Sequence, residues 1–156
     1  MRLTIIQGGS QTGDELAEAA DRYIERIRHF FPLEVVHVLP ERGRQSADDA
    51  SIIRAQSAKT LAAIPGRGYT VVLDERGQTI DSLKFAKWLE GLTTSNPYGV
   101  NFVVGGDVGL DESVKDRADK LLSVSAMTLP HQLVRVILLE QIYRACTLMR
   151  NIRYHK

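Results

Sequence analysis

Two short stretches of the chain have the composition of loops that bind a small, flat ligand. The stretch at residues 105–110 reads GGDVGL, and glycines at this density let a ligand approach the backbone closely. The stretch at residues 123–130 has three hydroxyl side chains and ends at Pro130, which lacks an amide hydrogen. The backbone before Pro130 is expected to leave regular strand pairing, so that its polar groups can hydrogen-bond an adenine edge. Taken alone, this stretch is explained more simply as a turn before a helix.

Two further loops carry weaker signals. The loop at residues 8–13 reads GGSQTG, but it matches neither the dinucleotide-binding nor the phosphate-binding glycine motif, and we interpret it as a flexible turn. In the DERG sequence at residues 74–77, the carboxylate of Asp74 could bind a ribose hydroxyl, although a solvated turn is the simpler interpretation.

Metal, hydrolase and dinucleotide chemistry find little support in the sequence. The four histidines are scattered, and neither an H-E-x-x-H motif nor a pair of cysteines is present. A G-x-S-x-G nucleophile motif is absent as well. Cys146 stands among apolar residues, so we expect it to be a small core residue rather than a nucleophile. We therefore predict no metal site, and a single cysteine allows no internal disulfide.

The apolar pattern predicts the elements that must hold these loops in place. Short runs rich in Val, Ile and Leu are typical of buried strands, at 3–7, 33–39, 69–74, 101–104 and 121–126. Helical spacing fills intervals between them, at 16–30, 50–64 and 85–92. Ser46 and Ser82 are the expected N-caps of the second and third helices. The alternation predicts an α/β fold, a mostly parallel sheet with helices on both faces, whose ligands bind beyond the carboxyl ends of the strands.

The residues after Pro130, from Leu133 to Met149, predict a helix that is apolar over nearly its whole circumference. Such a helix must be buried on several sides, either inside this domain or against a second copy of the chain. Because other helices already cover the sheet, we favour a symmetric homodimer with this helix at the interface. Arg135 and Glu140 interrupt the apolar surface, and each needs a partner or a ligand there.

Length, composition and charge indicate the number of domains, the compartment and the type of partner. A chain of 156 residues with 44% apolar side chains suffices for one domain, residues 1–156, without a metal or disulfide. The sequence has no signal-peptide or membrane-spanning pattern, which predicts a cytoplasmic protein. The net charge is only +1, yet residues 131–156 contain five basic side chains and one acidic side chain. This basic end suits a phosphate-rich partner, and cations that complement a helix C-terminus explain it equally well.

Four sequence blocks together closely resemble the RlmH family, small bacterial SPOUT-class methyltransferases. They are LDERG from Leu73, FVVGGDVGL from Phe102, LSVSAMTLPHQLVRVILLEQIYRA from Leu122, and the terminal YHK. The resemblance spans essentially the whole chain. It implies a SPOUT-type sheet whose C-terminal part forms a trefoil knot, a homodimer, and S-adenosylmethionine as the methyl donor. It also implies the reaction: methylation at N3 of a pseudouridine in large-subunit (23S) ribosomal RNA, on assembled ribosomes.

The resemblance also implies which residues do the work. Cofactor contacts fall on Leu73, Gly105, Val124, Ser125, Ala126, Met127, Thr128 and Leu129. The catalytic residues are the terminal pair Tyr154 and His155, to which we add Arg135, and the His155 imidazole is a candidate base for the N3 proton. The RNA contacts are expected from Arg144, Arg150, Arg153, Tyr154, His155 and Lys156. Tyr154 could stack on a base, or pack the tail against the partner subunit.

Asp107 departs from the family pattern, in which a small residue is usual at that place, and this could alter the polarity of the cofactor pocket. Two other classes of function stay open at this point. A non-catalytic module that binds the ribosome or RNA would use the basic tail, but would not need the two ligand-binding stretches. A nucleotide-dependent oxidoreductase would use those stretches, but lacks its fingerprint motif.

Overall fold

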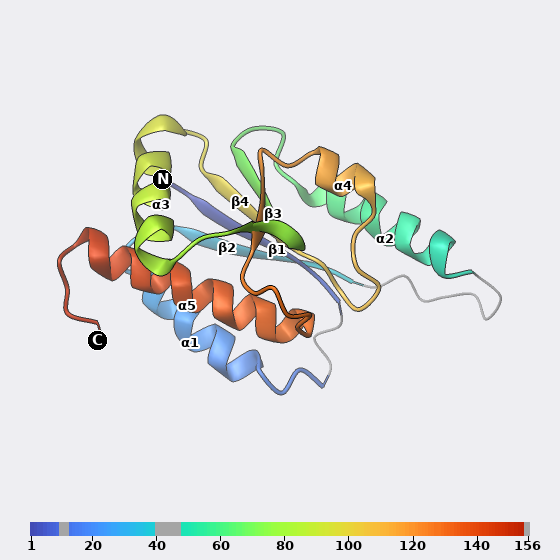
Figure 1. Cartoon of the computed structure of the whole chain (residues 1–156), viewed down its shortest axis with the longest axis horizontal. Coiled ribbons are helices and arrows are strands. Elements are labelled where there is room, and N and C mark those ends of the chain that lie inside the picture. The colour runs from blue at the N-terminus through green and yellow to red at the C-terminus, as the bar shows by residue number, and fades with distance from the viewer. Residues whose placement is uncertain (10–12, 40–47, 155–156) are drawn as a thin grey trace.

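The computed structural model describes residues 1–9, 13–39 and 48–154. Within them, strands and helices alternate along the chain (Figure 1). The strands are β1 (Leu3–Gly8), β2 (Leu33–Val38), β3 (Tyr69–Thr79), β4 (Val100–Val104) and β5 (Lys120–Ser123). The helices are α1 (Ala17–Arg28), α2 (Asp49–Ala63), α3 (Ser82–Ser95), α4 (Glu112–Asp116) and α5 (His131–Met149).

The strands form a five-stranded sheet in the order β2-β1-β4-β3-β5, and every pairing is parallel. β1 and β4 lie in its interior, and all of their residues are buried. This is why both strands are largely apolar and do not alternate regularly between apolar and polar residues. The parallel sheet predicted from the sequence is confirmed.

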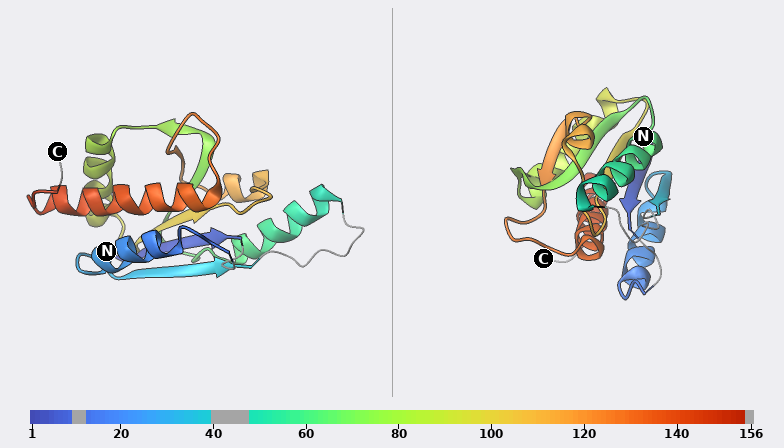
Figure 2. Two further views of the ribbon diagram at one scale, coloured as in Figure 1. Left: turned by 90° about the horizontal axis from the view of Figure 1, so that it is seen from below. Right: turned by 90° about the vertical axis from the view of Figure 1, so that its right-hand side faces the viewer.

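Helices cover both faces of the sheet, as predicted. Successive strand residues point to opposite faces, so Phe102 packs with α1, α3 and α5, whereas Val103 packs with α2 and α4. α1 and α5 lie side by side on the first face (Figure 2). α5 also packs against α3, so it is buried on several sides, as its apolar circumference predicted. Cys146 on α5 is fully buried, and burial raises the pKa of its thiol to about 12, which confirms a core residue.

Two strand boundaries differ from the prediction. β5 ends at Ser123, three residues before the predicted end, and β3 continues to Thr79, past the predicted turn. Both Leu73 and Gln78 of β3 pair with Leu122 of β5, so the residues between them form a bulge. A bulge adds residues to one strand and bends it, and hydropathy does not reveal this.

Gly77 lets the bulge approach β5 closely. A Cβ atom at this position would lie 2.6–2.8 Å from backbone atoms of Leu121 and Leu122, closer than real Cβ atoms come to backbone. The bulge can therefore form in this geometry only with glycine here.

The helix N-termini also correct the prediction. The N-cap of α2 is Asp48, whose carboxylate accepts a hydrogen bond from the Ser51 amide at 2.9 Å, and Ser46 lies outside the described residues. The N-cap of α3 is Asp81 rather than Ser82, with its carboxylate 2.8 Å from the Lys84 amide. Aspartate is as effective as serine at this position, so composition could not decide between neighbours. α4 was not predicted, because one short turn shows no periodicity.

We expect Gly77→Ala to lower the free energy of unfolding by roughly 1–3 kcal/mol, because the added methyl group must displace the backbone of β5. Urea denaturation at equilibrium measures this. Gly91→Ala is the matched control, since a Cβ atom at Gly91 on α3 would point into open space. There, alanine should raise stability by up to about 1 kcal/mol. Equal stability of Gly77→Ala and the parent protein would contradict the proposed close approach.

Candidate functional site

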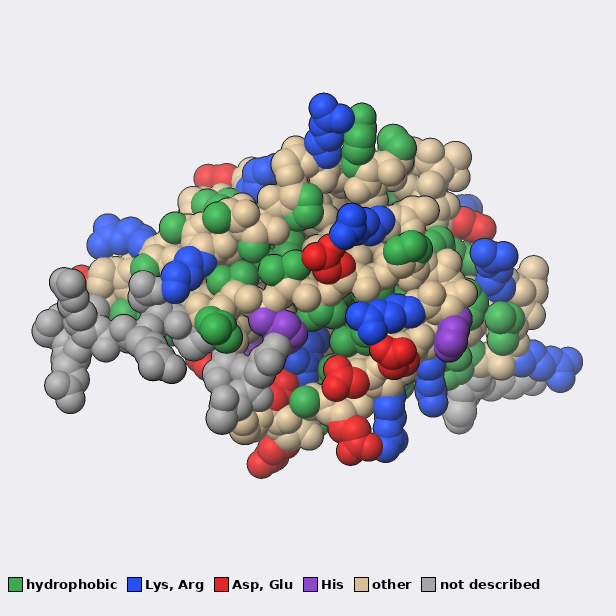
Figure 3. All heavy atoms as spheres, turned by 180° about the vertical axis from the view of Figure 1, so that it is seen from behind, with side chains coloured by type: hydrophobic (Ala, Val, Ile, Leu, Met, Phe, Trp, Pro, Cys, Tyr) green, Lys and Arg blue, Asp and Glu red, His purple; other side chains and the backbone are tan. Residues whose placement is uncertain are grey.

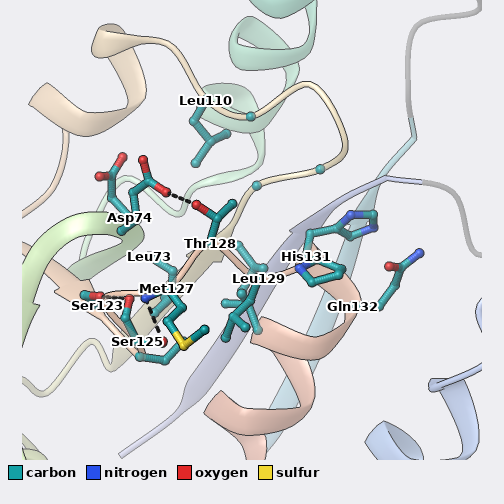
Figure 4. Close-up of a pocket in the computed structure, with 18 of the residues that line it drawn as sticks. Leu73, Asp74, Leu110, Ser123, Ser125, Met127, Thr128, Leu129, His131 and Gln132 are labelled. Atoms are coloured by element: carbon teal, nitrogen blue, oxygen red, sulfur yellow. Dashed lines mark hydrogen bonds between the residues drawn. The ribbon is translucent and has the colours of Figure 1, made fainter.

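A cavity of about 340 Å³ opens at the bulge of β3 and beyond the carboxyl ends of β4 and β5 (Figure 4). Its lining residues come from three segments: 73–75 in β3, 104–110 after β4, and 122–134 from the end of β5 into α5. We call residues 105–110 the glycine loop and residues 123–130 the hydroxyl segment. The two stretches singled out in the sequence thus face each other across one cavity, at the edge of the sheet where parallel folds bind ligands.

The glycine loop is held in place by backbone contacts. The amide of Gly109 donates a hydrogen bond to the carbonyl oxygen of Gly106 at 3.0 Å, which closes the loop. Gly106 also packs against the end of β1, where a Cβ atom on Gly8 would lie 2.8 Å from the Gly106 nitrogen. Gly8, in the loop at residues 8–13, therefore supports the wall of the cavity. Residues 10–12 of that loop lie outside the described part.

The hydroxyl segment leaves the sheet and hydrogen-bonds to itself. The Ser123 hydroxyl donates to the carbonyl oxygen of Ser125 at 2.6 Å, and the Ser125 hydroxyl accepts from the Met127 amide at 2.9 Å. Serine hydroxyls often replace backbone partners in this way where a strand stops. The irregular backbone predicted before Pro130 is confirmed, and it forms one wall of the cavity.

Asp74 at the cavity forms an ion pair with Lys115 of α4. The carboxylate and ammonium groups are 3.0 Å apart, and the two side chains are only 14% and 17% exposed. Burial alone would raise the pKa of Asp74, but hydrogen bonds from the Arg76 amide and from Lys115 outweigh it and hold that pKa below its usual value. The hydrogen bond to Asp74 in turn raises the pKa of Lys115. Both groups therefore stay charged near neutral pH.

Two other contacts join the walls of the cavity. The Thr128 hydroxyl lies 2.9 Å from the Glu75 carboxylate, so the hydroxyl segment is hydrogen-bonded to the bulge of β3. The Nδ1 atom of His131 lies 3.1 Å from the Asp107 carboxylate, which joins the start of α5 to the glycine loop. The His131 side chain is 9% exposed, and its ring packs against Gly9, where a Cβ atom would lie 2.8 Å from Nε2.

Most of the residues predicted to contact the cofactor line this cavity. They are Leu73, Gly105, Val124, Ser125, Met127, Thr128 and Leu129. Ala126 lies in the same segment, but it is exposed and is not among the lining residues. Leu110, which belongs to the predicted glycine-rich stretch, also lines the cavity, and sequence reasoning missed His131 and Gln132, which line it as well. The available signal was that His131 directly follows Pro130, at the end of the predicted ligand-binding stretch, whereas His131 was considered only as a metal ligand.

Arg135, predicted to be catalytic, lies outside the cavity lining. Its side chain is buried, and its guanidinium donates to Gln7 Oε1 at 2.9 Å and to Asp14 Oδ2 at 2.5 Å. Asp14 is therefore the partner that a charge at this position requires. Glu140, the other charge on the helix, accepts from the Arg144 guanidinium at 2.6 Å. The catalytic role of Arg135 stays a prediction.

The end of the chain packs against α1 and α5. The Tyr154 and Tyr143 rings meet edge to face with centroids 4.7 Å apart, and the Tyr154 hydroxyl lies 3.5 Å from that of Tyr23. The Arg144 guanidinium lies 5.0 Å from the centre of the Tyr154 ring. Burial and the Tyr23 hydroxyl raise the pKa of Tyr154 to about 12.

The other predicted RNA contacts are distributed over the same end. Arg150 and Arg153 are exposed, whereas His155 and Lys156 lie outside the described residues. Tyr143 follows His131 by twelve positions on α5, so the tail packs roughly 18 Å along the helix from the cavity. Figure 1 shows the described residues that follow α5 at the opposite end of that helix from the hydroxyl segment. A single protomer therefore does not bring Tyr154 to the cavity.

The described residues contain neither a candidate metal centre nor a candidate membrane span. No group of three or more His, Cys, Asp or Glu side chains is arranged to hold a metal ion there. In the same part of the chain, no helix is both long and apolar enough to cross a membrane.

Comparison with known protein families shows to which family this chain belongs. The family model described as "Predicted SPOUT methyltransferase" matches residues 1–155. This chain belongs to that SPOUT methyltransferase family. Two relatives of this SPOUT chain, from Chromobacterium violaceum and Gemmatimonas aurantiaca, are named "Ribosomal RNA large subunit methyltransferase H". They are 40% and 38% identical to it, and each alignment covers 100% of this chain and 99% or 100% of the relative. The RlmH resemblance read from the sequence is confirmed.

Solved structures with similar folds support the architecture. A probable methyltransferase from Bordetella pertussis has a TM-score of 0.58 at 14% identity, covering 93% of each chain. A probable methylase family protein from Haemophilus influenzae has a TM-score of 0.57 at 13% identity, covering 99% of this chain and 70% of that one. At such identities the likeness establishes the SPOUT-type arrangement of strands and helices alone.

We expect Lys115→Met to destabilise the protein by about 1–3 kcal/mol at pH 7, because it leaves the half-buried Asp74 carboxylate without its cation. Since the pKa of Asp74 is lowered on folding, the ion pair contributes fully above the ordinary aspartate pKa of about 4. Its contribution is lost as the pH falls through the lowered value. The difference between variant and parent should therefore be constant from about pH 5 to pH 8 and shrink below about pH 4.

Urea denaturation across this pH range tests the expectation. Lys84→Met is the matched control, since Lys84 pairs with Asp81 on the surface, where the two side chains are 77% and 56% exposed. An exposed pair of this kind contributes little to stability. A Lys115→Met difference that persisted unchanged at low pH would rule out the ion pair as its cause.

Proposed function

We propose that this protein transfers a methyl group from S-adenosylmethionine to N3 of a pseudouridine in large-subunit (23S) ribosomal RNA, on assembled ribosomes. The observation that carries the proposal is the cavity between the glycine loop and the hydroxyl segment, in a chain of the SPOUT methyltransferase family. The names of its relatives support ribosomal RNA as the substrate.

The cavity fits the methyl donor. Small-molecule sites have volumes of roughly 300–1,000 Å³, with apolar walls and a few aimed polar groups. Leu73, Leu110 and Leu129 supply apolar wall, and the glycine loop allows close backbone approach at Gly105. We propose that Leu73, Gly105 and the residues from Val124 to Leu129 hold the donor. When bound, S-adenosylmethionine supplies an activated methyl group on a sulfonium.

Methyl transfer of this kind needs alignment more than a metal ion or a covalent intermediate. The cavity walls hold the donor and exclude water, so that the methyl group faces the incoming nitrogen. The N3 proton of the base must leave, and we propose that the His155 imidazole accepts it, because imidazole titrates near neutral pH. Tyr154 and Arg135 complete the proposed catalytic set, Tyr154 beside the target base and Arg135 by fixing the first turns of α5 through Asp14.

The position of the tail supports a homodimer. Tyr154 packs far from the cavity of its own protomer. It can therefore form one site with a cavity only if that cavity belongs to a partner protomer. α5 offers a surface for it: Ile137 and Gln141 are half-buried and line a second cavity of about 300 Å³, and Leu148 is exposed. We propose a symmetric homodimer in which the tail of one protomer reaches the cavity of its partner.

We also propose the finer topology that the resemblance to the RlmH family implies, in which the segment around the cavity forms a C-terminal trefoil knot within one domain, residues 1–156. A knotted backbone around the donor would fix the glycine loop and the hydroxyl segment relative to each other without disulfides or metals.

The surface charges favour the ribosome over free RNA. On the face in Figure 3, Lys and Arg side chains are interspersed with Asp and Glu and form no continuous basic area. With a net charge of +1, few phosphate contacts are available to hold free RNA. We propose that Arg144, Arg150, Arg153 and Lys156, with Tyr154 and His155, bind RNA as part of a larger ribosomal surface in the cytoplasm.

Two measurements test the function. Isothermal titration calorimetry should detect S-adenosylmethionine binding and no NAD binding. Mass mapping of ribosomal RNA from cells with and without the protein should reveal one methylated pseudouridine that depends on it. Absence of donor binding would favour the non-catalytic RNA-binding module, and NAD binding would favour an oxidoreductase. Full activity on naked transcript would contradict action on assembled ribosomes.

We expect His155→Ala to abolish methylation of ribosomes while the dissociation constant for S-adenosylmethionine changes less than about twofold, because the base acts on RNA rather than on the donor. Single-turnover methylation and calorimetry measure the two effects. Equal turnover by the variant and the parent enzyme would remove His155 from the role of base.

A further inference from the structure

The charged side chains that line the main cavity are mostly acidic. Asp74, Glu75 and Asp107 line it, and no Lys or Arg is among its lining residues, where the one basic side chain is His131. A donor with a carboxylate of its own would be repelled by such walls unless it also carried positive charge. The cavity is therefore electrostatically matched to a cationic ligand.

The three carboxylates differ in their partners. Asp74 is paired with Lys115 at 3.0 Å, and Asp107 contacts the His131 imidazole at 3.1 Å. Among the described residues Glu75 has a different kind of partner, the neutral hydroxyl of Thr128 at 2.9 Å. A hydroxyl orients a carboxylate but leaves its charge uncompensated. Glu75 is thus the carboxylate of the cavity whose charge remains available to a ligand.

The Glu75 carboxylate points toward the hydroxyl segment. Figure 4 shows the hydrogen bond from Thr128 to a carboxylate that extends from the β3 side of the cavity toward the hydroxyl segment. Glu75 therefore lies beside the residues from Val124 to Leu129 that we propose as donor contacts. The bulge of β3 is what turns the side chain there, since the strand would otherwise continue along β5.

The methyl transfer changes the charge of the ligand by one unit. The bond between the methyl carbon and sulfur breaks, its electron pair stays on sulfur, the methyl carbon bonds to nitrogen, and the nitrogen releases its proton. The sulfonium donor, S-adenosylmethionine, becomes the neutral thioether S-adenosylhomocysteine. The two molecules differ in this methyl group and in this charge, so a charge-sensitive contact can separate them.

We propose that Glu75 is a specificity-determining residue, whose oriented carboxylate makes the cavity prefer the cationic donor over the neutral product. The inference rests on the proposed function and adds to it a physical reason for product release. Once the methyl group has moved, the attraction to Glu75 falls, and the spent cofactor leaves the cavity faster than the donor would. Because Glu75 is exposed to solvent, we expect a preference of roughly three- to tenfold rather than the larger factors of buried pairs.

The experiment compares three ligands on the full-length protein by isothermal titration calorimetry: S-adenosylmethionine, S-adenosylhomocysteine and sinefungin, which has an ammonium group in place of the methylated sulfonium. The parent protein should bind both cationic ligands more tightly than the neutral one. Glu75→Gln keeps the shape and the hydrogen bond from Thr128, and it should reduce the ratio of affinities roughly three- to tenfold. Raising the salt concentration should reduce the ratio in the parent protein and not in the variant.

Two further variants isolate the cause. Glu90→Gln makes the same change of net charge on the exposed surface of α3, away from the cavity, and should leave the ratio at the parent value. Thr128→Val removes the hydroxyl but keeps the Glu75 carboxylate, so all three ligands should weaken while cationic ligands stay preferred. Thermal unfolding of each variant checks that it is folded.

The outcomes are distinct. An unchanged ratio in Glu75→Gln, or an equal loss of affinity for all three ligands, would overturn the inference and leave the methyltransferase proposal intact. A change of the same size in Glu90→Gln would also overturn it, because net charge would then be the cause. Failure of the parent protein to bind any of the three ligands would refute the proposed function itself, and the inference with it.

Discussion

Close backbone approach at glycines is the constraint on which the cavity depends. At Gly8 a side chain would collide with the Gly106 nitrogen, and at Gly77 it would collide with the backbone of β5. The first contact holds the glycine loop against the end of β1, and the second lets β3 bulge toward the hydroxyl segment. Without both contacts the three strand ends would lie farther apart, and their loops would not enclose one volume.

Charged and hydroxyl side chains then hold the walls of the cavity in the positions that the glycines allow. Asp74 pairs with Lys115, His131 contacts Asp107, and Thr128 donates to Glu75, so each wall of the cavity is joined to an element distant in sequence. Exposed ion pairs contribute little to stability. Removing one partner of a half-buried pair destabilises the protein, because the other charge is left without a partner. The walls therefore keep their spacing, as a site that must align two reacting atoms requires.

α5 separates the two functional regions of a protomer. Its first turn borders the cavity, and Tyr143 in its C-terminal half contacts Tyr154. The helix places Tyr143 roughly 18 Å from its first residue, His131. The same helix is apolar on nearly every side, and within the protomer it packs against both α1 and α3. Burial of the core, and the catalysis and assembly that we propose, thus all involve this one element.

The sequence by itself determined the alternation of strands and helices, the parallel sheet and the two loops at its carboxyl edge, because local periodicity and turn chemistry report burial and chain direction. It did not determine the bulge after Leu73, which depends on pairing with a strand distant in sequence. It also did not determine the aspartate caps or α4, because neighbouring residues can cap a helix equally well and a single short turn shows no periodicity. Only the tertiary structure placed Arg135 on Asp14 and away from the cavity, and Tyr154 at the far end of α5. A residue type indicates which chemistry is available, whereas packing and long-range pairing decide where the side chain lies and what it contacts.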